Sequence, residues 1–207
     1  MFTAMLPANT IDDLRTRARQ AIRGGYEEPK AVIDSLVELI EYDPETEKLF
    51  ASDRAGAVAE ITAVVSAEDS RYFSEVGSWP PETDCDRLAA VFTSLDSGGI
   101  VARENIGYTR SDLQDEMSEL VANLLKAGRG VRGWVGFHGQ DVERAIDGGG
   151  LYLGFAPARD SSEAAWLDVG NAIVDAFKSA GFKVAWNGTS SERPHLAPVD
   201  WKRRRQP

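Results

Sequence analysis

The residues best suited to acid–base chemistry lie in one short polar turn. Within Gly133–Ala156 the chain has the pattern of a buried strand, a polar turn, a short helix, a glycine break and a second buried strand. His138, Gln140 and Asp141 lie together in that turn. An imidazole exchanges protons near neutral pH, and a nearby carboxylate and amide can orient it or bind a ligand. The turn is therefore the strongest candidate for a catalytic or ligand-binding site.

The same residues also fit a purely structural role. Asp141 is placed to cap the helix that follows the turn, and His138 can then be a hydrogen-bonded core residue at the end of a strand. The sequence leaves both interpretations of the turn open. The two interpretations differ in geometry, because a functional site needs these side chains to converge in a cavity.

Further candidates lie on other elements. Arg103 is on an expected strand at Ile100–Asn105, where it would either select an anionic ligand or protect a sheet edge from unwanted pairing. Trp186, Asn187 and Arg193 surround an expected hairpin turn. Trp186 would either fill the core or stack on a ligand, and the other two would line the mouth of a cleft.

Several familiar chemistries have no support in the sequence. The chain has no glycine-rich phosphate loop ending in Gly-Lys-Ser/Thr and no Gly-x-Ser-x-Gly motif. His138 and His195 are far apart and lack the spacing of a metal site, so we expect no metal. Cys85 lies between two aspartates, whose charges oppose thiolate formation. We expect no cofactor.

Composition narrows the class of partner. The chain has 207 residues, 43% of them hydrophobic, and a formal net charge of −10. That charge repels phosphate backbones, so we expect no nucleic acid and instead a protein partner of basic character or a small anionic ligand. The chain has one cysteine, no secretory signal and no apolar run long enough for a membrane span, which predicts a cytoplasmic protein without membrane contact.

The first third of the chain has the pattern of three helices. Apolar residues recur at helical spacing after Thr10, after Glu28 and after Glu45, and each set forms one apolar face. We therefore expect a helical segment over residues 1–66. Gly77 and two prolines make residues 67–82 a connector.

Residues 83–201 are expected to form an α+β domain. Helices beginning at Thr83, at Thr109 or Ser111, and near Ser161 alternate with short apolar strands. This order predicts an N-terminal helical segment followed by a mixed sheet of about five strands packed with helices. Residues 202–207 follow as a basic tail.

The chain also resembles a family of uncharacterised bacterial proteins, a domain of unknown function. The resemblance covers roughly residues 79–201 and is carried by the Phe137-His138-x-Gln140-Asp141 element and by the turn Trp186-Asn187-Gly188. Relatives are expected to have Asp in this turn, where this chain has Asn187, so the resemblance implies no acid role at that position. The resemblance implies a shared fold and a shared site region, and it implies no reaction.

Two functions of different class follow. The first is a non-catalytic binding or interaction protein, such as an antidote or regulator whose acidic surface docks on a more basic partner. The alternative is a small enzyme or sensor of an anionic ligand, with its site at the turn from His138 to Asp141. The sequence favours the first.

Overall fold

A computed structural model describes residues 6–44 and 46–205 of the chain, which form two compact units. One unit, called here the helical unit, combines the described residues up to Pro80 with those from Lys202 onward. The other, called the α/β unit, is Pro81–Trp201. The α/β unit is thus inserted between two segments of the helical unit. The structure has eight helices and six strands in the described part of the chain.

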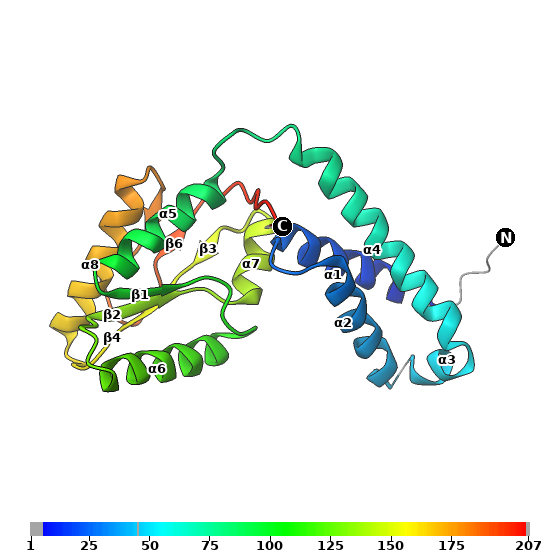
Figure 1. Ribbon diagram of the computed structural model, residues 1–207, viewed down its shortest axis with the longest axis horizontal. Coiled ribbons are helices and arrows are strands. Elements are labelled where there is room, and N and C mark those ends of the chain that lie inside the picture. The colour runs from blue at the N-terminus through cyan, green and yellow to red at the C-terminus, as the bar shows by residue number, and fades with distance from the viewer. Residues whose placement is uncertain (1–5, 45, 206–207) are drawn as a thin grey trace. The chain divides into compact units, whose positions relative to one another are not determined.

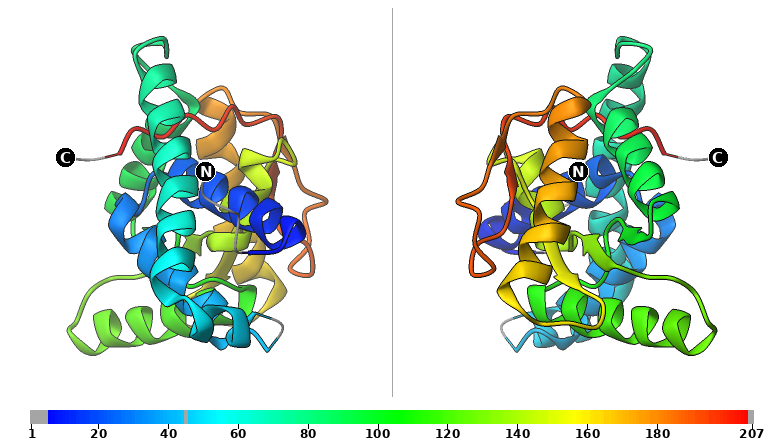
Figure 2. Two further views of the ribbon diagram at one scale, coloured as in Figure 1. Left: turned by 90° about the vertical axis from the view of Figure 1, so that its right-hand side faces the viewer. Right: turned by 90° about the vertical axis from the view of Figure 1, so that its left-hand side faces the viewer.

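The helical unit is built from amphipathic helices. Leu14, Ala18 and Ile22 recur every four residues on its first helix and are fully buried, because this spacing places them on one face. The fourth and longest helix packs against the first two, as the left view of Figure 2 shows. The unit contains α1 (Ala8–Gly24), α2 (Pro29–Tyr42), α3 (Glu47–Ser52) and α4 (Arg54–Val76) (Figure 1).

The third expected helix is two helices, and the expected connector is largely helical. Asp53 begins α4 as its N-cap and accepts a hydrogen bond from the Gly56 amide at 2.9 Å. From there α4 continues to Val76, so only the last residues of the segment 67–82 form a connection. Glu45, where the third helix was expected to begin, lies outside the described residues.

The α/β unit is centred on a mixed sheet, as predicted. Its order is β1-β2-β4, with β1 parallel to β2 and β4 antiparallel to β2. Figures 1 and 2 show α5 and α8 on one face of this sheet and α6 on the other. These elements are β1 (Ile100–Arg103), β2 (Gly133–Gly136), β4 (Gly154–Pro157), α5 (Asp84–Ser97), α6 (Arg110–Lys126) and α8 (Glu163–Ser179).

The prediction of one sheet of about five strands is wrong, because the strands divide into two sheets of three. The expected strand at Leu151–Ala156 divides at Leu153, whose amide donates to the Pro194 carbonyl at 2.9 Å. Its first half pairs away from the main sheet and its second half pairs with β2. The second sheet has the order β3-β6-β5, formed by β3 (Leu151–Tyr152), β6 (His195–Leu196) and β5 (Val184–Ala185).

Side-chain caps fix where two helices of the α/β unit begin. Thr83 and Thr109 accept hydrogen bonds from the amides three residues later, and the aspartates at those positions accept bonds from the threonine amides. Such reciprocal capping boxes satisfy backbone donors that the first helical turn leaves free. The predicted caps of α5 and α6 are therefore confirmed, and the second of them places Arg110 at the first position of α6.

The basic segment at the C-terminus is bound to the helical unit over its described residues. Lys202 to Arg205 are all partly buried, and the Arg205 guanidinium pairs with Asp69 at 2.8 Å. Residues 202–205 of the predicted basic tail are therefore part of the helical unit. The last two residues of the predicted tail, 206 and 207, lie outside the described part.

None of the helices in the described part of the chain is both long enough and apolar enough to cross a membrane.

Candidate functional site

The His138 turn lies at the carboxyl ends of the parallel strands β1 and β2. The loop after β1 runs beside the turn, because the Ile106 amide donates to the Phe137 carbonyl at 3.0 Å and the Gly139 amide donates to the Gly107 carbonyl at 3.1 Å. Carboxyl ends of parallel strands are the usual position of ligand sites in α/β folds. From this turn begins α7 (Gly139–Ile146).

His138 and Asp141 form a buried pair. His138 is 4% exposed and Asp141 is 1% exposed, and the imidazole Nε2 lies 3.0 Å from an Asp141 carboxylate oxygen. Asp141 also accepts a long hydrogen bond of 3.5 Å from the His138 amide, which makes it a cap of α7 as well. The imidazole therefore has almost no surface on which a ligand could bind.

Arg193 completes this group from the loop that precedes β6. Its guanidinium donates two hydrogen bonds to the Asp141 carboxylate, at 2.9 and 3.2 Å. The guanidinium also lies over the ring of Tyr152, 5.0 Å from its centre, and the Tyr152 ring stacks with the His195 ring at a centre-to-centre distance of 4.1 Å. These contacts fix the orientation of the Arg193 guanidinium. A guanidinium has five N–H donors, so those that do not bond to Asp141 can bind a ligand.

Burial is the main influence on the charge of His138. It lowers the pKa of the imidazole, and the nearby Arg193 charge lowers it further, while the Asp141 carboxylate opposes both. The net direction is downward, so His138 is neutral at pH 7. A neutral ring leaves the Asp141 charge to be balanced by Arg193.

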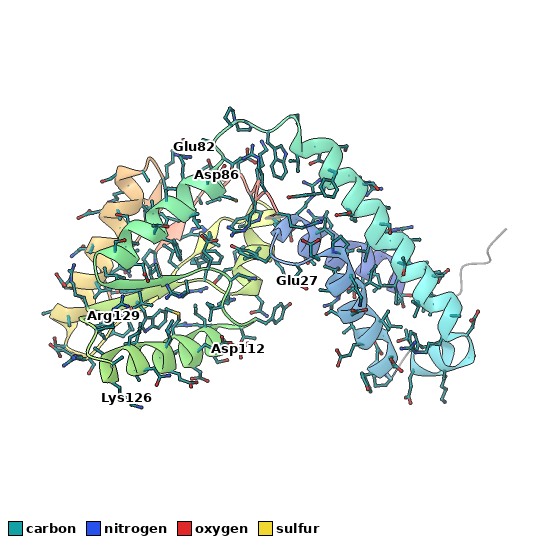
Figure 3. The ribbon with its side chains drawn as sticks, in the orientation of Figure 1. Glu27, Glu82, Asp86, Asp112, Lys126 and Arg129 are labelled. Carbon is teal, nitrogen blue, oxygen red and sulfur yellow. The ribbon has the colours of Figure 1, made fainter. Side chains whose placement is uncertain are left out.

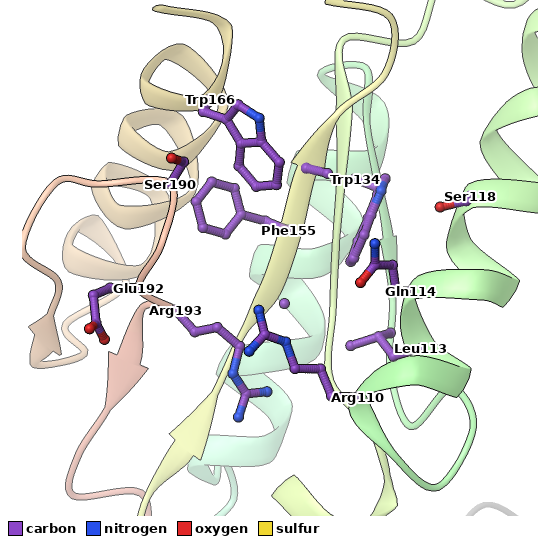
Figure 4. Close-up of a pocket in the computed structure, with 12 residues that line it drawn as sticks. Arg110, Leu113, Gln114, Ser118, Trp134, Phe155, Trp166, Ser190, Glu192 and Arg193 are labelled. Carbon is purple, nitrogen blue, oxygen red and sulfur yellow. The ribbon is translucent and has the colours of Figure 1, made fainter. Parts of the chain in front are cut away.

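A cavity of about 210 Å³ lies beside Arg193, along the edge strand β4 (Figure 4). Figure 4 shows the guanidinium groups of Arg193 and Arg110 pointing into the same space, below the rings of Phe155 and Trp166. The wall combines charged, polar and aromatic groups: Arg110, Leu113, Gln114, Ser118, Trp134, Gly154, Phe155, Ala156, Trp166, Ser190, Glu192 and Arg193.

Arg110 supplies the positive charge of the cavity. Arg193 is balanced by Asp141, whereas the Arg110 side chain makes no ion pair or hydrogen bond with any residue in the described part of the chain. The carboxylate of Glu192 lies to the side of the loop away from the two guanidinium groups in Figure 4. An anion placed between the two arginines would therefore meet one uncompensated charge and several N–H donors.

Of the residues predicted for the site, only Arg193 lines this cavity, and it brings His138 and Asp141 with it as buried supports. Gln140 is exposed near the start of α7. Arg103 forms an ion pair with Asp96 of α5 at 2.8 Å. These two residues take no part in the cavity wall.

The hairpin residues support the loop that carries Arg193. The Trp186 indole donates to the carbonyls of Thr189 and Glu192, both at 3.1 Å, and its ring packs edge-on against Phe155. The Asn187 side chain accepts bonds from the amide and hydroxyl of Thr189. Neither residue lines the cavity, so both act through the shape of the loop.

Sequence reasoning missed most of the cavity wall. Arg110 follows the capping threonine of α6, and this position in the first turn was a signal that could have found it. Trp134 and Phe155 lie on opposite faces of the sheet, since Trp134 is opposite Ala156 and Phe155 is opposite Val135. Both reach the cavity because β4 is the edge strand, a position that the sequence does not specify. Trp166 is added from α8.

Comparison with known protein families matches residues 7–205 to the family described as Domain of unknown function (DUF6891). The chain belongs to this family. The DUF6891 match confirms the resemblance to an uncharacterised family and extends it beyond residues 79–201 to the helical unit. No curated protein and no solved structure matches the chain.

Among the residues that the structure describes, no three His, Cys, Asp or Glu side chains are grouped as metal ligands would be.

Proposed function

We propose that this DUF6891 protein is a binding protein for a small anionic molecule that carries an apolar or aromatic group. The observation that carries the proposal is the cavity shared by Arg110 and Arg193 beneath Phe155 and Trp166. Guanidinium groups recognise carboxylates through paired N–H donors, and aromatic walls bind flat apolar groups. The volume of about 210 Å³ is smaller than that of pockets for drug-sized ligands, which limits the ligand to a small molecule.

Binding is favoured over catalysis by the burial of the acid–base pair. A general base must come within hydrogen-bond reach of the proton that it removes. His138 is 4% exposed and its Nε2 already faces Asp141, so the pair positions Arg193 instead of reaching a ligand. Docking of a basic protein, which the net charge predicts, is a separate function that would use another surface.

Intrinsic tryptophan fluorescence tests the proposal, because Trp134 and Trp166 line the cavity. The probes are benzoate, which joins a ring to a carboxylate, acetate, which lacks the ring, and benzyl alcohol, which lacks the charge. We expect a saturable signal with benzoate, weaker binding of acetate and no saturation with benzyl alcohol. Benzyl alcohol binding as tightly as benzoate would contradict the role of the arginines.

The matched variants are Arg110→Gln and Arg129→Gln. Both remove one positive charge, but Arg129 lies beyond the far end of α6 and is not part of the cavity wall, as Figure 3 shows by its distance along the helix from Asp112. Because a hydrogen bond to a charged group contributes about 1.5–3 kcal/mol, Arg110→Gln should weaken benzoate binding by at least about tenfold. Arg129→Gln should bind benzoate as tightly as the parent chain does. Equal losses of benzoate affinity in the two variants would contradict the proposal.

A further inference from the structure

The C-terminal segment is bound to the helical unit in the manner of a recognised peptide. The Tyr72 hydroxyl donates to the Arg203 carbonyl at 3.0 Å and accepts from the Arg205 amide at 2.7 Å. One side chain of α4 thus contacts the main chain on both sides of Arg204. Main-chain bonds of this kind bind a peptide backbone regardless of its sequence.

Specificity in this contact comes from alternate arginine side chains. The Arg203 guanidinium lies over the ring of Tyr26, 4.1 Å from its centre. The Arg205 guanidinium lies over Tyr72 and Phe73, at 5.0 and 5.5 Å. Stacking on aromatic faces favours arginine, whose planar group lies flat on a ring, over the compact ammonium of lysine.

Two carboxylates also bind the Arg205 side chain. Its side chain is only 9% exposed, and it pairs with Asp69 at 2.8 Å and with Glu28 at 3.8 Å. Arg204 between them donates to the Pro80 carbonyl at 2.6 Å, and its guanidinium lies 6.0 Å from the centre of the Trp79 ring. The closer stacks of Arg203 and Arg205, at 4.1 and 5.0 Å, make these the two positions at which the surface prefers arginine most strongly.

The backbone of Arg203 packs closely against Gly25. Its φ of +74° is costly for a residue with a side chain, and a Cβ atom built there would lie 3.0 Å from the Arg203 carbonyl oxygen. The backbone of the segment therefore lies directly against the end of α1. With the aromatic and acidic residues it forms a defined surface, called here the arginine groove: Gly25, Tyr26, Glu28, Asp69, Tyr72 and Phe73.

We propose that the arginine groove is a docking site for an Arg-x-Arg segment of a basic protein partner, and that Arg203–Arg205 occupies it until the partner displaces it. The groove is open at one side, since Phe73 is 60% exposed and the Glu28 side chain is 67% exposed. The net charge of −10 attracts a basic partner. This inference does not depend on the ligand cavity of the α/β unit.

An intramolecular segment competes at a high effective concentration, so the groove must first be emptied to measure its own affinity. The full chain with Arg203→Ser and Arg205→Ser would be titrated calorimetrically with a peptide of residues 199–205. We expect this variant to bind the peptide at least about tenfold more tightly than the parent chain does. A peptide with lysine at the positions of Arg203 and Arg205 should bind the variant at least about tenfold more weakly than the original peptide.

A matched variant checks that the peptide binds in the arginine groove. Adding Asp69→Asn and Tyr72→Phe to the emptied chain removes one carboxylate and the hydroxyl that contacts the backbone, and peptide binding should be lost. Arg204→Ser alone should leave the groove occupied and the peptide unbound. An emptied chain that stays folded and does not bind the peptide, or binds the lysine peptide equally well, overturns the proposal.

A second measurement uses the unaltered chain, in case the emptied variant does not fold. Excess hexa-arginine should speed hydrogen exchange of the Arg205 amide, whose partner is the Tyr72 hydroxyl, and hexa-lysine should not. Unchanged protection with both peptides would overturn the proposal. Dimers of the parent chain that form with rising concentration through this segment would also overturn it, because the occupant would then be a second copy.

Discussion

Asp141 contributes to the cavity by holding Arg193 in place while itself remaining buried. Asp141→Asn would leave the guanidinium, which is 22% exposed, with its charge uncompensated. Breaking a buried ion pair in this way costs about 3 kcal/mol, and we expect a loss of that size in the free energy of unfolding, measured by urea denaturation. The variant should also weaken benzoate binding, since Arg193 loses its fixed orientation.

The matched control is Asp168→Asn. Asp168 pairs with Arg132 at 2.8 Å, and both side chains are about half exposed or more. Solvent-exposed pairs contribute less than about 1 kcal/mol, so this variant should unfold nearly like the parent. Equal losses in the two variants would show that the buried pair is not special.

His138 should make stability depend on pH. Its pKa is lowered in the folded chain, chiefly by burial, so the unfolded chain binds more protons once the pH falls below the ordinary histidine value of about 6.5. The free energy of unfolding therefore decreases as the pH falls from about 6.5 toward the folded pKa, by up to about 1.4 kcal/mol per pH unit.

Urea denaturation at several pH values between 5 and 7.5 checks this expectation, with His138→Gln as the control that lacks the titrating group. The parent should lose stability relative to the variant as the pH falls. An NMR titration of the His138 ring measures the pKa itself. A ring pKa above 6.5 would contradict the account of a buried, neutral imidazole.

At the scale of elements, the α8 helix is constrained by the loop that carries Arg193. A Cβ atom at Gly170 would lie 2.4 Å from the Trp186 ring and 3.1 Å from that of Phe155. Gly170→Ala should therefore destabilise the α/β unit by about 1–3 kcal/mol despite the better helix propensity of alanine.

Gly77 is a suitable comparison. It follows α4 with a φ of −64°, and a Cβ atom there would meet nothing within 4 Å. Gly77→Ala should leave the midpoint of thermal unfolding unchanged or raise it slightly. If Gly170→Ala were equally harmless, the close contact of α8 with Trp186 would be refuted.

The sequence predicts elements best where the apolar spacing is unbroken. Leu14, Ala18 and Ile22 predicted the existence of α1 correctly, although the helix begins at Ala8 and not at Thr10. In α4 the buried positions include Ile61, Val65 and Tyr72, but Glu68 interrupts the stripe and is 7% exposed. Glu68 thus interrupts the apolar spacing, and Gly77 with two prolines follows it, which is why residues 67–82 were predicted to be a connector.

Strand pairing was harder to predict than strand existence. The segments that form β1, β2 and β4 are apolar enough to be recognised, and their mixed arrangement was expected. The split at Leu153 into two sheets depends on a hydrogen bond to Pro194, more than forty residues away. A separation of 52 residues likewise hid the ion pair of Asp141 with Arg193, although both residues had been selected as candidates.

At the scale of the whole molecule, the helical unit includes residues 202–205, which are far in sequence from its other residues. Truncation after Trp201 removes the pairing of Arg205 with Asp69 and its stacking on Tyr72. We expect the helical unit to lose about 2 kcal/mol of stability. Hydrogen exchange should show faster exchange in α1 and α4 and unchanged exchange in β1 and β2, and a uniform change in both units would contradict the assignment of this segment to the helical unit.

The most direct test of the ligand cavity is an NMR titration of the arginine Nε–Hε signals with benzoate. The account predicts that the signals of Arg110 and Arg193 shift together and saturate at one affinity, while that of Arg132, which pairs with Asp168 outside the cavity, stays in place. Shifts of equal size in all three signals, or no shift in the first two, would contradict it.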